Sequence, residues 1–172
     1  TDNGDGTWSL IQSQLSDLSI TPPSDDDGDF TLTVTATASE GGSTSQSVGT
    51  IDVSVAAVAD APSLSVAAAS GNEDTAISLS LSSALTDTDG SESLGIVISG
   101  VPTGATLSAG TDNGDGTWTL TSAQLSGLSI TPPSDDDSDF TLTVTATATD
   151  GASTTQSVGT VAVTVGAVAD AP

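Results

Sequence analysis

The chain of 172 residues contains 23 Asp and Glu but no Lys, Arg or His, so its formal net charge at pH 7 is −23. It contains no Cys either, which excludes a disulfide scaffold and, together with the absence of His, the usual ligands of zinc and iron. Nucleic acid is not expected as a partner, because phosphate is bound mainly by Lys and Arg. No apolar run reaches the about 20 residues of a membrane span, so we expect no direct membrane insertion of this segment.

A 62-residue segment occurs twice in the chain. Residues 1–62 recur as residues 111–172, at an offset of 110 positions and with 48 identities. Solenoid repeats are only about 20–50 residues long, so a period of 110 residues indicates a whole domain. We therefore expect residues 1–62 to be the C-terminal part of one repeat unit (the partial repeat) and residues 63–172 to be a complete unit (the complete repeat).

The complete repeat is predicted to consist of short strands. The clearest pattern is at 140–149, where apolar residues alternate strictly with threonines, as in a strand with one buried face. Asn113-Gly114 predicts a hairpin turn. Trp118 and Phe140 are expected to supply most of the bulky core. In chain order, the candidate strands are 63–68, 77–81, 94–98, 105–108, 117–120, 128–131, 140–149 and 161–165.

This succession of strands without helical periodicity predicts an all-β fold, a two-sheet antiparallel sandwich of immunoglobulin-like type. The acidic residues fall almost entirely between the predicted strands, so folding is expected to gather them at the two poles of the sandwich. Unpaired carboxylates about 4 Å apart repel by about 1 kcal/mol in water, and a divalent cation removes that repulsion. Oxygen ligands without His or Cys favour a hard ion, and Ca²⁺ tolerates flexible carboxylate sets better than Mg²⁺ does. The alternative is that these acidic loops are only solvated surface.

Several short motifs of the complete repeat resemble those of cadherin-like extracellular repeats, specifically the repeats of giant bacterial RTX-type adhesins and related biofilm matrix proteins. The Val-Ala-Asp-Ala-Pro segments ending at Pro62 and Pro172 resemble the Asp-Asn-Ala-Pro linker of cadherins. The other matching motifs are Asp87-Thr-Asp89, Ala148-Thr-Asp150-Gly, Asp135-Asp-Asp137 ahead of the strand at Phe140, and an early glutamate at Glu73. The linker lacks the cadherin Asn and first Asp, which implies fewer ions per junction, and the RTX nonapeptides are absent.

The resemblance implies tandem cadherin-like sandwiches with calcium at each junction. One cluster would combine Asp25, Asp27 and Asp60 of the partial repeat with Asp87, Asp89 and Asp150 of the complete repeat. Half of a second cluster would consist of Glu73, Asp135, Asp137 and Asp170.

The implied function is that of a non-enzymatic, secreted or cell-surface spacer in an adhesin, used in cell adhesion or biofilm formation, whose partners are neighbouring repeats of the same chain. The main alternative is a self-assembling extracellular filament or sheath, in which like chains complete the partial repeat by strand exchange. Three weaker alternatives are ice binding by the threonine ladder at 141–149, a glycosidase acid pair within 135–139, and a carbohydrate-binding module, for which only Trp8 and Trp118 could provide an aromatic platform.

Overall fold

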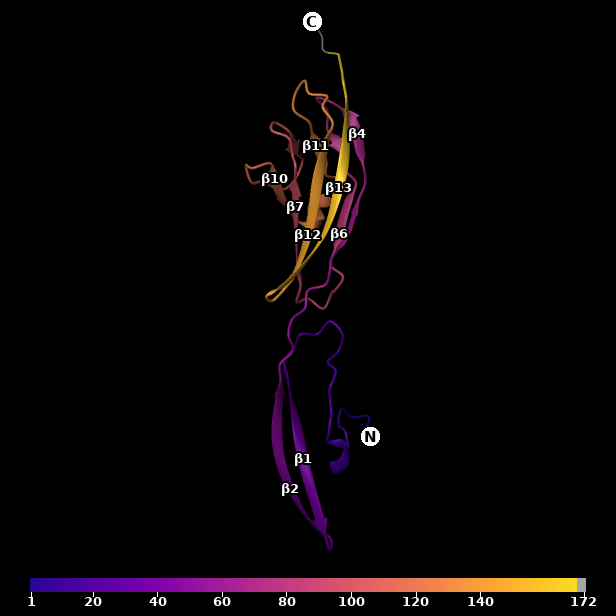
Figure 1. Cartoon of the computed structure of the whole chain (residues 1–172), viewed down its shortest axis with the longest axis vertical. Coiled ribbons are helices and arrows are strands. Elements are labelled where there is room, and N and C mark those ends of the chain that lie inside the picture. Colours follow the sequence, from indigo (N-terminus) through magenta and orange to yellow (C-terminus); the bar gives the residue numbers. More distant parts are fainter. Residues whose placement is uncertain (170–172) are drawn as a thin grey trace.

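The protein is an all-β molecule in which two groups of strands lie end to end (Figure 1). The computed structural model describes residues 1–169. Strands β1 and β2 lie in the partial repeat, and β3 to β13 lie in the complete repeat. Within residues 1–169, no sheet combines strands from both repeats. The same range contains no helix with the length and apolar character needed to cross a membrane.

The partial repeat is built on one long hairpin. Strand β1 (Phe30–Glu40) pairs antiparallel with β2 (Ser43–Val53), and the turn between them uses two glycines with positive φ, Gly41 (54°) and Gly42 (85°). Such a pair of left-handed residues matches the twist of the flanking strands. Ahead of the hairpin lie the 3-10 helix η1 (Gln12–Gln14) and a single bridge between Asp2 and Trp8. No side chain of residues 1–61 is buried.

The complete repeat is organised around a six-stranded sheet of order β4-β13-β12-β7-β10-β9. Five further strands form two smaller sheets, β5-β11-β8 and β3-β6. The 3-10 helix η2 (Ser122–Leu125) joins β10 to β11. The strands of the large sheet are β4 (Ala69–Asn72), β7 (Ser93–Ser99), β9 (Thr111–Asp112), β10 (Thr117–Leu120), β12 (Phe140–Asp150) and β13 (Ser153–Gly166). Those of the smaller sheets are β3 (Ser63–Val66), β5 (Ile77–Ser78), β6 (Leu81–Ala84), β8 (Thr106–Leu107) and β11 (Ser129–Thr131).

The predicted strands are largely present, but several bounds differ, and β4 and β9 were not predicted. The turn at Asn113-Gly114 connects β9 to β10, where Asp112 pairs with Trp118, so the hairpin prediction is confirmed. The predicted strand at 77–81 is divided into β5 and β6, and β13 begins well before residue 161. The expectation of a purely antiparallel sandwich is wrong at one edge, because β4 runs parallel to β13. A chain that crosses between the sheets can join an edge in this direction without a hairpin.

The core is aliphatic rather than aromatic. Leu142, Val144, Ala146 and Ala148 on β12 are fully or almost fully buried, as the alternation predicted. Trp118 and Phe140 are only partly buried, so the expectation that they supply most of the bulky core is wrong. The reason is their position: β10 is separated from the edge of the sheet only by β9, and Phe140 is the first residue of β12.

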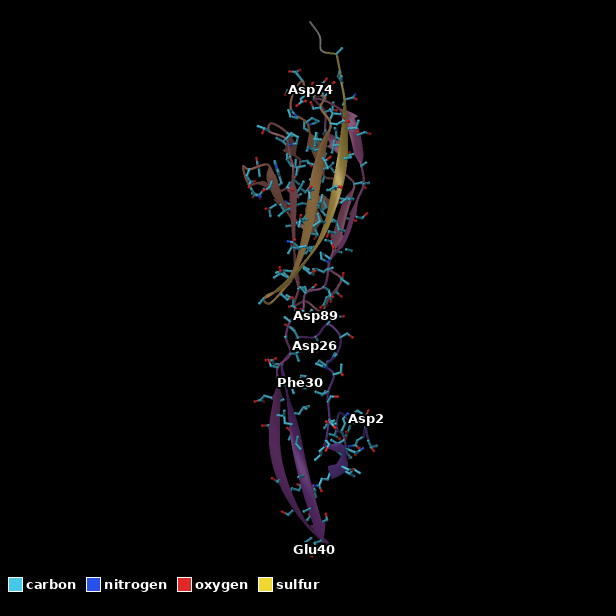
Figure 2. The ribbon with its side chains drawn as sticks, in the orientation of Figure 1. Asp2, Asp26, Phe30, Glu40, Asp74 and Asp89 are labelled. Carbon is cyan, nitrogen blue, oxygen red and sulfur yellow. The ribbon has the colours of Figure 1, made fainter. Side chains whose placement is uncertain are left out.

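Acidic residues lie at both poles of the complete repeat, as predicted from their place between strands. Figure 2 shows Asp74 at one end of this repeat and Asp89 at the other, where Asp26 of the partial repeat lies across the junction. The pole at Asp89 therefore faces the partial repeat, and the pole at Asp74 faces away from it.

Candidate metal centre

The linker between the repeats is held on the complete repeat by hydrogen bonds. The backbone N–H of Asp60 donates to Glu92 Oε1 (2.7 Å), and that of Ala59 donates to Ser153 Oγ (3.0 Å). Asp60 is therefore placed by its own backbone, which leaves its carboxylate free to point into the junction. Two side-chain hydroxyls hold the following residues: Thr86 Oγ1 donates to the carbonyl of Ala61 (2.7 Å) and Ser157 Oγ to that of Pro62 (2.6 Å).

Glu92 is a site residue that the sequence analysis missed. Its side chain is only 9 % exposed, and its second oxygen, Oε2, is buried and has no hydrogen-bond partner within residues 1–169. A buried carboxylate oxygen without a partner is unfavourable unless a proton or a cation satisfies it. The only signal for Glu92 in the sequence was its position three residues after the Asp87-Thr-Asp89 motif.

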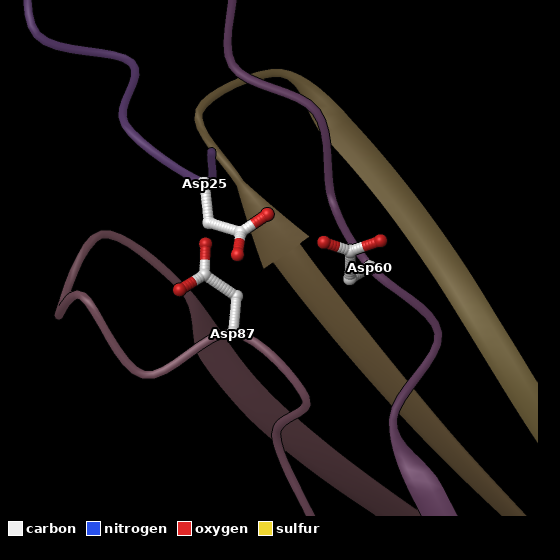
Figure 3. Close-up of side chains that lie close together, drawn as sticks. All are labelled: Asp25, Asp60 and Asp87. Carbon is white, nitrogen blue, oxygen red and sulfur yellow. The ribbon is translucent and has the colours of Figure 1, made fainter. Parts of the chain in front are cut away.

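Three aspartates from three different segments meet at the junction. Asp25 lies in the loop before β1, Asp60 in the linker, and Asp87 in the loop between β6 and β7. Each contributes a carboxylate oxygen, and these oxygens lie within 4.8 Å of one another. Figure 3 shows the carboxylates of Asp25 and Asp87 facing each other, with Asp60 beside them. We refer to these three residues as the junction triad.

The local backbone explains how two members of the triad are oriented. Asp25 has a φ of 60°, the left-handed conformation that Asp and Asn tolerate better than most residues. Asp87 is 5 % exposed, and its Oδ1 accepts the backbone N–H of Asp89 (2.8 Å), which closes the loop and fixes the carboxylate. Within the triad, Asp25 is thus exposed, Asp87 is buried, and Asp60 is intermediate in exposure.

The triad lies in a cavity of about 360 Å³ that is lined by both repeats and the linker. Asp27 and Asp150 line it as well, and Asp150 is only 4 % exposed. Five of the six residues predicted for this junction therefore gather around one space. Asp26, which was not predicted, is a further acidic residue of the lining.

Asp89 is the exception among the predicted ligands of this junction. Its carboxylate is turned toward Ser91, whose backbone N–H (2.7 Å) and hydroxyl (2.8 Å) both donate to Oδ1. These two hydrogen bonds, the backbone one foremost, lower the pKa of Asp89 because they stabilise the charged form. The loop thus places Asp89 at the rim of the junction rather than in the triad.

The predicted residues at the other pole are not gathered into a cluster. Glu73 is 6 % exposed and accepts the backbone N–H of Val168 (2.7 Å), so it holds the outgoing linker as Glu92 holds the incoming one. Asp135 has a left-handed φ of 58° and donates its backbone N–H to Asp74 (3.2 Å). Asp137 is exposed, and Asp170 lies outside the described residues. Within residues 1–169, the junction triad is the one group of three acidic residues close enough to share an ion.

The cavity is strongly anionic, with a lining whose charged groups are all acidic. All its acidic groups are carboxylates, and the chain has no Lys, Arg or His to neutralise them. Carboxylates supply the oxygen ligands that Ca²⁺ and Mg²⁺ require. The arrangement offers no His, Cys or Tyr to act as an acid, base or nucleophile.

Comparisons with known proteins assign no family to the chain. No protein-family model matches it, and no curated protein matches it. Among solved structures, it is similar to an endo-fucoidan hydrolase from glycoside hydrolase family 107, with 19 % sequence identity and a TM-score of 0.32. The match covers 87 % of this chain and 20 % of the enzyme chain, so this chain spans about a fifth of that enzyme's length. A likeness this low carries no argument about fold or activity.

Proposed function

We propose that the chain is part of an extracellular spacer in which calcium at the junctions keeps successive immunoglobulin-like, cadherin-like sandwiches in line. The observation that carries this proposal is the junction triad, because its members come from the partial repeat, the linker and the complete repeat. An ion held by all three segments would join them more firmly than the linker alone.

The ion we propose is Ca²⁺. It accepts six to eight oxygen ligands in flexible geometry, whereas Mg²⁺ requires a strict octahedron and retains several waters. The triad supplies three carboxylates, and Asp27 and Asp150 line the same cavity. Asp89 uses only Oδ1 for its bonds to Ser91, so its Oδ2 remains available to an ion at the rim.

The same logic applies to the far pole of the complete repeat. Glu73, Asp135 and Asp137 are proposed as one half of the next junction, together with Asp170, with the remaining ligands supplied by a following repeat. Glu73 already contacts the outgoing linker through Val168, so the linker is oriented there before any ion binds.

The proposed spacer is non-enzymatic and belongs to a secreted or cell-surface protein such as a bacterial adhesin, where it would serve adhesion or biofilm formation. A chain without Lys, Arg, His, Cys or Tyr has few groups for acid–base or nucleophilic catalysis, which supports a structural role. Its direct partners would be neighbouring repeats.

A second candidate function, a filament or sheath completed by strand exchange between like chains, is favoured by the exposed apolar side chains of the partial repeat. Trp8 and Ile11 are each 66 % exposed, although both are large and apolar.

Calorimetric titration with calcium tests the proposed site. The unmodified chain should show saturable binding that is strongly weakened by Asp87→Asn and by Asp150→Asn. The matched control is Asp115→Asn, because Asp115 also caps a tight loop, accepting the backbone N–H of Thr117 (3.1 Å), but lies in the β9–β10 turn. Equal losses in all three variants would indicate diffuse attraction of cations, and the absence of any saturable binding would refute the proposal.

A further inference from the structure

The turn between β9 and β10 contains a chemically labile pair of residues. Asn113 is followed by Gly114, and both are exposed. In such a pair the backbone nitrogen of the glycine can attack the side-chain amide carbon of the asparagine, because no glycine side chain hinders the approach. The new N–C bond displaces ammonia, which carries away the glycine N–H proton, and a succinimide forms. Water then opens this ring to aspartate or isoaspartate.

The folded turn holds the side chain that would be attacked. Asn113 Nδ2 donates to Thr117 Oγ1 (2.9 Å) and to Thr119 Oγ1 (3.1 Å), both on β10. The backbone N–H of Asn113 also donates to the carbonyl of Thr117 (3.0 Å). Both hydrogens of the side-chain amide thus have an acceptor, and the amide carbon is kept against β10.

The attacking nitrogen is held as well. The backbone N–H of Gly114 donates to Asp112 Oδ1 (2.8 Å). The attack requires this nitrogen to lose its proton, and a carboxylate beside it disfavours a second negative charge. The two reacting groups are therefore bound to different partners, one to β10 and the other to Asp112.

Thr117 connects the contacts of the turn. Its hydroxyl accepts the hydrogen bond from Asn113 and donates to Asp115 Oδ1 (2.6 Å), so one oxygen serves as acceptor and as donor. Asp115 also accepts the backbone N–H of Thr117 (3.1 Å). These two hydrogen bonds, the side-chain one foremost, lower the pKa of Asp115 because they stabilise its charged form. The charged carboxylate in turn fixes the Thr117 hydroxyl that holds Asn113.

The partial repeat contains the same contacts in the equivalent loop. Asn3 Nδ2 donates to Thr7 Oγ1 (2.8 Å) and to Ser9 Oγ (3.1 Å). The backbone N–H of Gly4 donates to Asp2 Oδ1 (2.9 Å). No side chain of this loop is buried, so the contacts are formed by the residues of the loop and do not depend on packing around it.

We propose that Asn113 is a deamidation site that the folded β9–β10 turn keeps unreactive, with Thr117 as its positioning residue. Release of the turn allows the reaction. Each event converts a neutral amide into a carboxylate in a chain without Lys, Arg or His, and isoaspartate adds a carbon to the backbone between β9 and β10. The turn does not line the junction cavity, so this proposal is independent of the proposed ion.

Peptide mapping by mass spectrometry measures deamidation in the full chain, incubated at mildly alkaline pH with and without guanidinium chloride. Cleavage after Trp8 and after Trp118 gives separate fragments for Asn3 and Asn113. Asn113 should deamidate at least about tenfold more slowly in the folded chain, because two hydrogen bonds must be released before the attack. Thr117→Val should raise the rate toward that of the unfolded chain, whereas Thr117→Ser, which keeps a hydroxyl, should not.

Thr111→Val is the matched control, because Thr111 is an exposed threonine of β9 whose hydroxyl is not a partner of Asn113. It should leave the rate at Asn113 unchanged, and Thr117→Val should leave the rate at Asn3 unchanged. Amide exchange on β10 is followed in parallel; if Thr117→Val unpairs this strand, Thr119→Val replaces it and should also accelerate the reaction. Equal rates at Asn113 in the folded and unfolded chain would overturn the proposal. Equal acceleration by Thr117→Val and Thr117→Ser would overturn it too, as would a Thr→Val variant with β10 paired and the rate unchanged.

Discussion

Replacing Asp25 by Asn is expected to change the junction in opposite directions with and without calcium. Two unit charges 4.8 Å apart repel by about 0.9 kcal/mol in water. The substitution removes two of the three repulsive pairs of the triad, so in chelator it favours the closed junction by about 1.7 kcal/mol at low salt. This free energy corresponds to an increase of more than about tenfold in the ratio of closed to open molecules. In calcium, the same change removes a ligand and should open the junction.

Single-molecule energy transfer measures this directly. The chain has no cysteine, so dyes can be attached through Thr33→Cys on β1 and Val97→Cys on β7, both exposed positions on opposite sides of the junction. The dye-labelled chain without further changes should give a narrow distribution of transfer efficiencies in millimolar calcium and a broad one in chelator. Asp25→Asn should narrow the distribution in chelator and broaden it in calcium.

Asp17→Asn is the matched control for this experiment. Asp17 is exposed and has a φ of 63°, almost the same left-handed backbone as Asp25, but it lies outside the junction cavity. The Asp17→Asn substitution removes the same charge and should leave the distributions of transfer efficiencies in calcium and in chelator unchanged. A change of the same sign in calcium and in chelator for Asp25→Asn would refute the electrostatic account of the junction.

Three further predictions follow from individual side chains. Val144→Ala should lower the unfolding free energy of the complete repeat by about 2 kcal/mol, whereas Val34→Ala, at the equivalent but exposed position, should cost less than about 0.5 kcal/mol, as measured by denaturant unfolding. Glu92→Ala should speed amide exchange of Asp60, whose N–H loses its acceptor, while Glu40→Ala should not. Ser91→Ala should raise the pKa of Asp89 in an NMR titration. The hydrogen bonds from Ser91 lower the pKa of Asp89 in the folded chain. Their contribution to stability is therefore complete above the unfolded-state pKa and is lost as the pH falls through the folded-state pKa. An Asp89 titration that Ser91→Ala leaves unshifted would contradict this prediction.

Local patterns were sufficient to predict much of the fold. Strict alternation at 140–149 predicted the buried face of β12, and Asn113-Gly114 predicted the β9–β10 hairpin, because both features depend on neighbouring residues. The direction of β4 depends instead on how the chain crosses between the sheets, which no local pattern records. The burial of Trp118 likewise depends on the order of strands in the sheet. Its size alone suggested a place in the core, which was wrong.

The candidate site, too, was predicted in part from the sequence, and the part that was missed depends on a contact between distant residues. Asp25, Asp60 and Asp87 were predicted from their place between strands and from the resemblance to cadherin-like motifs, and the structure brings them together. Glu92 was missed because its role depends on a contact with the backbone of Asp60, 32 positions away. Asp89 was assigned to the cluster by its motif, yet its carboxylate is turned toward Ser91 by two short hydrogen bonds within the loop.

The register of β13 has a mechanical consequence for a chain under tension. The chain enters the complete repeat through β3 at the junction pole and leaves it through β13 at the opposite pole (Figure 1). A pull along this axis loads β13 lengthwise against β12, to which it is paired without interruption from Phe140↔Val163 to Asp150↔Ser153. Because ladder hydrogen bonds are perpendicular to the strands, they lie across the load and must break together rather than one after another. This repeat is therefore expected to resist stretching by shear.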